Sequence, residues 1–130
     1  MTPSRPVLLY DGECKFCRFC AAAIAACDLR GNLGILPFGD PEAAALLEPV
    51  PAAERRASMH LARPGGSVAS AGDAVLDLVG LLLRSSSAGT PANRPDTLRR
   101  IAGRTYSAVA NARGTIGRFV PDVAVTRRPR

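Results

Sequence analysis

Four cysteines lie within fourteen residues of the chain: Cys14, Cys17, Cys20 and Cys27. A disulfide framework joins distant segments, so a local cluster indicates redox or metal chemistry instead. Cys14 and Cys17 form a C-x-x-C motif, which can cycle between a dithiol and a disulfide. Alternatively, the four thiols, with His60 as a spare ligand, could hold zinc or an iron–sulfur cluster.

The C-x-x-C motif stands between a predicted strand and a predicted helix. Residues 6–10 are a short apolar run typical of a buried parallel strand, and the Asp11-Gly12-Glu13 sequence indicates a turn. From Cys14 the chain has no Gly or Pro until Gly31 and is rich in alanine, which predicts a helix. Cys14 should therefore lie at the helix start and Cys17 in the first turn.

A helix start suits a reactive thiol. Its free backbone N–H groups and the positive end of the helix dipole stabilise a thiolate, and Lys15 and Arg18 add positive charge nearby. We expect Cys14 to attack a substrate disulfide, giving a mixed disulfide that Cys17 then resolves. Asp11 is a candidate acceptor for the Cys17 proton, and a role as a turn or N-cap acid is the simpler alternative.

The other two cysteines are expected to pack and not to react. A helical wheel places Cys20 and Cys27 on one apolar arc. The other members of that arc are Phe16, Phe19, Ala23 and Ile24. The wheel turns the pair away from Cys14, and the spacing differs from zinc knuckles and from the ferredoxin run, so a metal site is disfavoured. His60 is expected to be a strand residue and not a ligand.

The remaining pattern predicts an α/β domain around the motif. Further strands are expected at 33–37, 58–62 and 67–70, and helical segments at 40–47, 52–56, 74–84 and from about Pro95, the last interrupted by Gly114 and Gly117. This order is that of a thioredoxin-like fold: a central four-stranded mixed sheet flanked by helices, with an extra C-terminal helix. Residues 1–120 should form this domain, followed by a basic, disordered tail at 121–130.

Length and composition limit the other classes of function. The 130 residues are 47% hydrophobic and 22% charged, which fits one globular domain. No apolar run reaches the roughly 18 residues of a membrane span, and the N-terminus lacks a signal-peptide pattern, so we expect a cytoplasmic protein with reduced thiols. The formal charge is +6, but aromatic residues make up only 5% and Trp is absent, so nucleic-acid binding is not expected.

Residues 10–17, read as Y-D-G-E-C-K-F-C, resemble the Y-D-G-x-C-x-F-C signature of the DCC family of thiol-disulfide oxidoreductases. The similarity extends over roughly residues 7 to 120 and includes Asp28, the Pro37-Phe38 pair, 58–61, 70–75, Tyr106 and 111–113. The resemblance implies a thioredoxin-like fold. It also places the family's Asp-Cys-Cys triplet on Asp11, Cys14 and Cys17.

The expected reaction class implies partners but no particular substrate. These would be a disulfide-containing protein or small molecule and a thiol reductant, with no cofactor. Better-studied thioredoxin-fold enzymes have a cis-proline just before the third strand. Here that place is near Ala57-Ser58, and the nearest proline is Pro51. Two alternatives stay open: a zinc or iron–sulfur module, and a non-catalytic thioredoxin-like interaction domain.

Overall fold

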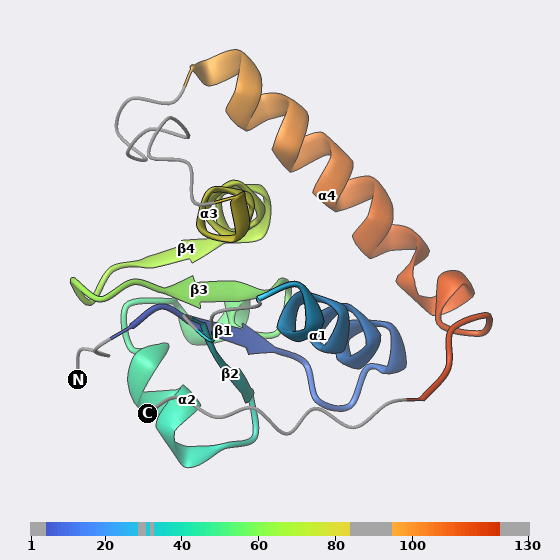
Figure 1. Ribbon diagram of the computed structural model, residues 1–130, viewed down its shortest axis with the longest axis horizontal. Helices are drawn as coiled ribbons and strands as arrows, with labels where there is room; N and C mark the ends of the chain where they lie inside the picture. Colours follow the sequence, from blue (N-terminus) through green and yellow to red (C-terminus); the bar gives the residue numbers. More distant parts are fainter. Residues whose placement is uncertain (1–4, 29–30, 32, 84–94, 123–130) are drawn as a thin grey trace.

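A single mixed sheet forms the centre of the computed structural model, which describes residues 5–28, 31, 33–83 and 95–122 (Figure 1). Its strands are β1 (Val7–Tyr10), β2 (Gly34–Pro37), β3 (His60–Ala62) and β4 (Val68–Ser70). They lie in the order β2-β1-β3-β4. β1 and β2 are parallel, and the other two pairings are antiparallel. The predicted four-stranded mixed sheet is thereby confirmed.

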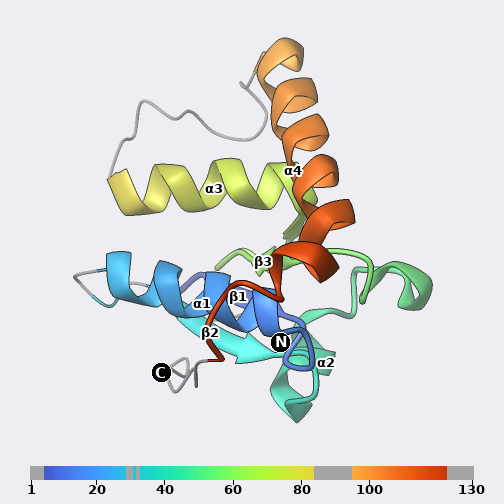
Figure 2. The same cartoon turned by 90° about the vertical axis from the view of Figure 1, so that its right-hand side faces the viewer.

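Helices cover both faces of this sheet. They are α1 (Lys15–Cys27), α2 (Pro41–Leu46), the short 3₁₀ helix η1 (Ala52–Glu54), α3 (Ala71–Leu83) and α4 (Asp96–Ile116). In Figures 1 and 2, α1 and α3 lie on one face and α2 on the other, while α4 packs across α3 and α1. This arrangement is the predicted thioredoxin-like fold with an extra C-terminal helix. No helix in the described residues has the length and apolar character needed to cross a membrane.

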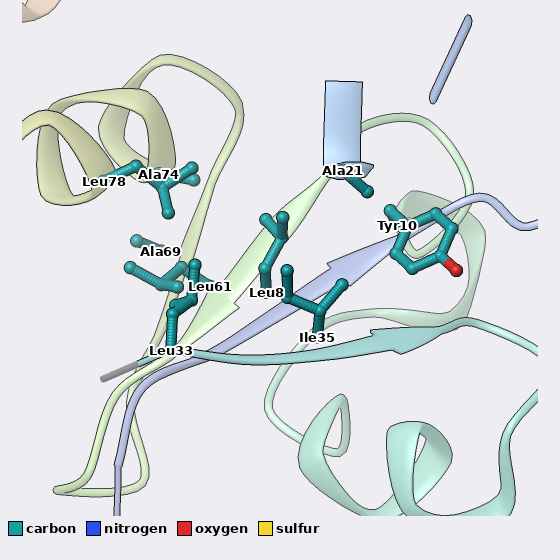
Figure 3. Packing of buried hydrophobic residues seen from close by; sticks show 9 residues of the cluster. All are labelled: Leu8, Tyr10, Ala21, Leu33, Ile35, Leu61, Ala69, Ala74 and Leu78. Atoms are coloured by element: carbon teal, nitrogen blue, oxygen red, sulfur yellow. The ribbon is translucent and has the colours of Figure 1, made fainter. Parts of the chain in front are cut away.

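Alternation along β1 divides the core into two layers. Leu8 and Tyr10 point to the face covered by α1 and α3 (Figure 3), and Val7 and Leu9 point to the face covered by α2. All four are buried. Because β1 is central and covered on both faces, its sequence is continuously apolar, as expected for such a strand. A strand held this firmly gives the turn that follows Tyr10 a defined starting point.

The extents of α3 and α4 differ from those predicted. α3 begins at Ala71 and not at Ala74, and Ala71 itself has a left-handed φ of +51°. The prediction that Gly114 interrupts α4 is wrong, because the helix continues to Ile116 and Gly117 is its C-cap. One glycine inside a long helix costs only about 1 kcal/mol, which the packing of α4 can offset.

The predicted tail falls mostly outside the described residues, which end at Asp122. The Asp122 carboxylate accepts hydrogen bonds from the Arg18 guanidinium, with the shorter at 2.8 Å. Arg18 also donates to the Gly12 carbonyl at 2.7 Å. The segment after α4 is therefore joined to the turn that precedes α1.

The crossing of α3 and α4 depends on a glycine. A Cβ added at Gly72 would lie 2.6 Å from the Gly103 nitrogen and 2.8 Å from the Ala102 carbonyl carbon. Both atoms belong to the α4 backbone, which cannot move aside as a side chain could. A Cβ at Gly103, in contrast, would meet nothing within 4 Å.

These two glycines form a matched test of the packing. We expect Gly72→Ala to destabilise the fold by about 1–3 kcal/mol through overpacking. Gly103→Ala should instead stabilise it by about 0.5–1 kcal/mol, because alanine is the better helix former. Urea unfolding of both variants measures the difference. Equal effects of the two substitutions would contradict the close approach of α3 to α4.

Candidate functional site

Cys14 is the N-cap of α1. Its backbone is extended, with φ −93° and ψ 117°, and its Sγ accepts a hydrogen bond from the Cys17 backbone N–H at 3.3 Å. The Cys14 N–H donates to the Asp11 carbonyl, also at 3.3 Å, which closes the turn after β1. The sequence thus predicted the helix start correctly. The structure adds that the Cys14 sulfur itself provides the cap.

The Cys17 side chain lies one turn along and is hydrogen-bonded to Cys14. Burial, this hydrogen bond and the nearby charges of Cys14 and Asp11 raise the pKa of Cys17 to about 12, while Arg113 acts in the opposite direction. Cys17 is consequently a protonated thiol at neutral pH. Its S–H can donate to the Cys14 sulfur, so the two sulfurs have different environments.

Asp11 acts as a turn acid, which is the simpler of the two roles predicted for it. Its Oδ1 accepts the Glu13 backbone N–H at 3.0 Å, so the carboxylate stabilises the turn that leads into α1. Asp11 also borders the same cavity as Cys17, and its charge contributes to the raised pKa of that thiol. One carboxylate therefore both shapes the turn and acts electrostatically on Cys17.

An apolar cavity of about 500 Å³ lies behind the motif. α1, α3, α4 and the sheet all contribute to it, mainly through aliphatic and aromatic side chains such as Phe16, Ile24, Val75, Ile101 and Val109. The sulfur-bearing residues of its wall are Cys17, Cys20 and Met59. Because Cys17 and Cys20 border this space, burial is the main reason that the pKa of each thiol is raised.

Two α4 residues beside the motif were not predicted as part of the site. The Tyr106 hydroxyl accepts the Met59 backbone N–H at 2.7 Å, and burial raises the pKa of Tyr106. Arg113 is close enough to lower the pKa of both Cys17 and Tyr106. No short-range pattern in the sequence links either residue to the C-x-x-C motif. Both residues do belong to the late segment that resembles the family. This resemblance is the feature of the sequence that could have indicated their place in the site.

The third strand was predicted to begin at residue 58, with Ala57-Ser58 at the cis-proline position, but β3 begins at His60, so Met59 directly precedes it. The described residues contain no cis peptide bond. The Met59 N–H is engaged by Tyr106, and its carbonyl accepts the Ala71 N–H at 3.1 Å. The backbone before β3 is therefore held by α4 on one side and by the start of α3 on the other.

The remaining cysteines behave differently from each other. Cys20 is half-buried against the cavity, in agreement with its predicted packing role. The prediction that Cys27 is buried is wrong, because Cys27 is exposed. The packed face of α1 runs through Ala21, Ile24 and Asp28, so the real arc is rotated from the predicted one and leaves Cys27 toward solvent.

The four cysteines do not come together as a shared metal site would require. Cys14 and Cys27 stand at opposite ends of α1, about 20 Å apart along a 13-residue helix. No group of three or more His, Cys, Asp or Glu side chains in the described residues is arranged to hold a metal ion. His60 lies in β3, as predicted. Its Nε2 donates to the Arg55 carbonyl at 2.9 Å and its Nδ1 accepts from the Ser70 hydroxyl at 2.6 Å.

Comparison with known proteins agrees with this picture. A family model described as DCC1-like thiol-disulfide oxidoreductase matches residues 8–119. The chain belongs to this family. The match spans β1 to α4 and so includes Cys14, Cys17, Tyr106 and Arg113, which confirms the resemblance noted in the sequence. Neither the curated proteins nor the solved structures that were compared give a match.

His60 should make the stability of the fold depend on pH. Burial is the main reason that the pKa of His60 lies below its ordinary value of 6.5. The unfolded chain then binds a proton more readily than the folded one, so stability present above pH 6.5 is lost as the pH falls through the folded pKa, by at most about 1.4 kcal/mol per pH unit. We expect the urea midpoint to fall between about pH 7.5 and 5.5.

The control for this titration is His60→Gln, which keeps a polar side chain but cannot titrate. This variant should be less stable at pH 7.5 and nearly insensitive to pH over the same range. An unchanged pH dependence in the variant would assign the effect to other groups.

Proposed function

We propose that this chain is a thiol-disulfide oxidoreductase in which Cys14 is the nucleophile and Cys17 the resolving thiol. The observation that carries the proposal is the pairing of the two sulfurs at the start of α1. Cys14 accepts the Cys17 backbone N–H, and the Cys17 thiol is hydrogen-bonded to Cys14. The family assignment supports the same reaction class.

The reaction proceeds in two displacements. The Cys14 thiolate attacks one sulfur of a substrate disulfide, so that a Cys14–substrate bond forms while the substrate S–S bond breaks and the first thiolate leaves. Cys17 then loses its proton and attacks the Cys14 sulfur, which forms the Cys14–Cys17 disulfide and releases the second thiolate. Two electrons pass from the enzyme dithiol to the substrate. An external thiol reductant restores the dithiol by the reverse exchange.

Ionisation of Cys17 is the demanding step, because its pKa is raised to about 12 in the dithiol state. Formation of the mixed disulfide removes the negative charge of Cys14 and the hydrogen bond from Cys17 to it. Both of these effects had raised the pKa of Cys17. Burial, the largest cause, and Asp11 still raise it, and Arg113 still lowers it. The resolving thiol is therefore easier to ionise after the first displacement than before it. We propose Asp11, which borders the same cavity, as the acceptor of the proton.

A non-catalytic interaction domain is the alternative that keeps the fold. It predicts no turnover of any disulfide by the purified dithiol protein. The reaction proposed here requires a reductant of the thiol class, which the reducing cytoplasm supplies.

Cysteine variants test the assignment directly. Cys14→Ser should abolish disulfide reduction, whereas Cys17→Ser should accumulate a mixed disulfide that mass spectrometry detects as an adduct on Cys14. Cys20→Ala serves as the control and should keep activity close to that of the unmodified protein, because Cys20 only packs against the cavity. Loss of activity in Cys20→Ala equal to that in Cys14→Ser would refute the assignment.

The pH dependence of the second displacement gives an independent measurement. Below the pKa of Cys17, its thiolate fraction and hence the rate of resolution should rise about tenfold per pH unit between roughly pH 6 and 8. Stopped-flow detection of the released second thiol, starting from the preformed mixed disulfide, isolates this step. Arg113→Gln should slow it at every pH, because the cation that lowers the pKa of Cys17 is gone. A rate independent of pH would show that Cys17 is already ionised or passes its proton directly to Asp11 during the attack.

A further inference from the structure

A second hollow, distinct from the apolar cavity, opens beside Cys14. It is a cleft of about 740 Å³ between the start of α1 and the C-terminal part of α4. Its charged lining residues are Lys15, Arg113 and Arg118, all of them cations, and Asn111 adds an amide. Within the described residues, the lining of this cleft contains no acidic side chain. Its size is in the range of small-molecule sites.

The acidic residues near the cleft have partners elsewhere. Glu13 makes an ion pair with Arg56 at 3.7 Å, and Asp122 makes one with Arg18 at 2.8 Å. Asp11 accepts from the Glu13 backbone and borders the other cavity. In the part of the chain that the structure describes, none of the three cleft cations makes an ion pair. The three cations beside Cys14 can therefore bind an anionic ligand.

Glycines shape this end of α4. A Cβ added at Gly117 would lie 3.7 Å from the Phe16 Cβ, so the end of α4 approaches the first turn of α1 closely. A Cβ at Gly114 would meet nothing within 4 Å, so this glycine leaves its side of the cleft open. Arg113, Arg118 and Cys14 thus line the same open volume.

We infer that the substrate is a small disulfide whose thiol fragments carry carboxylates. This inference rests on the proposed function and names the substrate class for it. Arginine guanidinium groups bind carboxylates through paired, charge-assisted hydrogen bonds. Carboxylates held by Arg113 and Arg118 place the substrate in the cleft that Cys14 lines. As in the two displacements above, two electrons pass from the enzyme dithiol to the substrate disulfide. The substrate is released as two carboxylate-bearing thiols.

Three small disulfides that differ in charge test the inference. Dithiodipropionate is a dianion, hydroxyethyl disulfide is neutral, and cystamine is a dication. Values of kcat/KM, each divided by the rate constant of the same disulfide with free dithiothreitol, should fall in that order. Raising the ionic strength from about 20 mM to about 500 mM should reduce the preference, because salt screens exposed charges.

Charge-neutralising variants test whether the cleft cations cause the preference for the dianionic disulfide. Arg118→Gln and Lys15→Gln should each lower the ratio of kcat/KM for the dianion to that for the dication by about two- to fivefold, as expected for an exposed charge pair. Arg104→Gln is the matched control, because Arg104 is exposed on the same helix and does not line the cleft. It should leave the ratio unchanged.

The outcomes separate this inference from the proposed function. Equal normalised rates for the three disulfides, or a preference that Arg104→Gln lowers as much as Arg118→Gln does, would overturn only the substrate class. Reduction of none of them, or full activity in Cys14→Ser, would overturn the proposed function and the substrate class together.

Discussion

The structure of the site depends on one cap. Because the Cys14 sulfur accepts the Cys17 backbone N–H, this sulfur, the proposed nucleophile, is held at the end of the helix and not on its side. The cap requires an extended Cys14, which in turn requires the turn closed between Cys14 and Asp11. That turn begins where β1 ends, at a Tyr10 that the core holds in place. The position of one sulfur therefore follows from the buried centre of the sheet.

The two sulfurs of the motif border different environments. Cys14 lines a cleft whose charged groups are all cations, and Cys17 lines an apolar cavity that opposes its ionisation. Arg113 borders both hollows and is the described cation that lowers the pKa of Cys17. In the proposed reaction, burial alone would leave Cys17 inert, and a fully solvated pair would not distinguish the attacking thiol from the resolving one. The different surroundings of Cys14 and Cys17, one helical turn apart, would provide this distinction.

Local patterns predicted the sheet, the helix start and the strand position of His60, because apolar runs, turn residues and alanine-rich segments determine structure over short distances. The incorrect predictions concern features that depend on packing between segments distant in the sequence. The wheel for α1 had the right period but the wrong rotation, since the sheet and α4 decide which side of α1 is buried, and Cys27 was misplaced as a result. Similarly, glycine is a poor helix former and Gly114 was predicted to interrupt the helix, yet α4 continues through it.

The largest contribution that sequence reasoning missed is that of α4 to the site. About ninety residues separate Cys17 from Tyr106 in the chain, and no short-range pattern links them. The link is made by the close approach at Gly72, which lets α4 cross α3 and reach Met59 through the Tyr106 hydroxyl. A side chain at Gly72 would clash with the backbone of the helix that carries both Arg113 and the Tyr106 hydroxyl. A glycine far from the motif in the sequence is thereby needed for the packing of the helix whose arginine acts on Cys17.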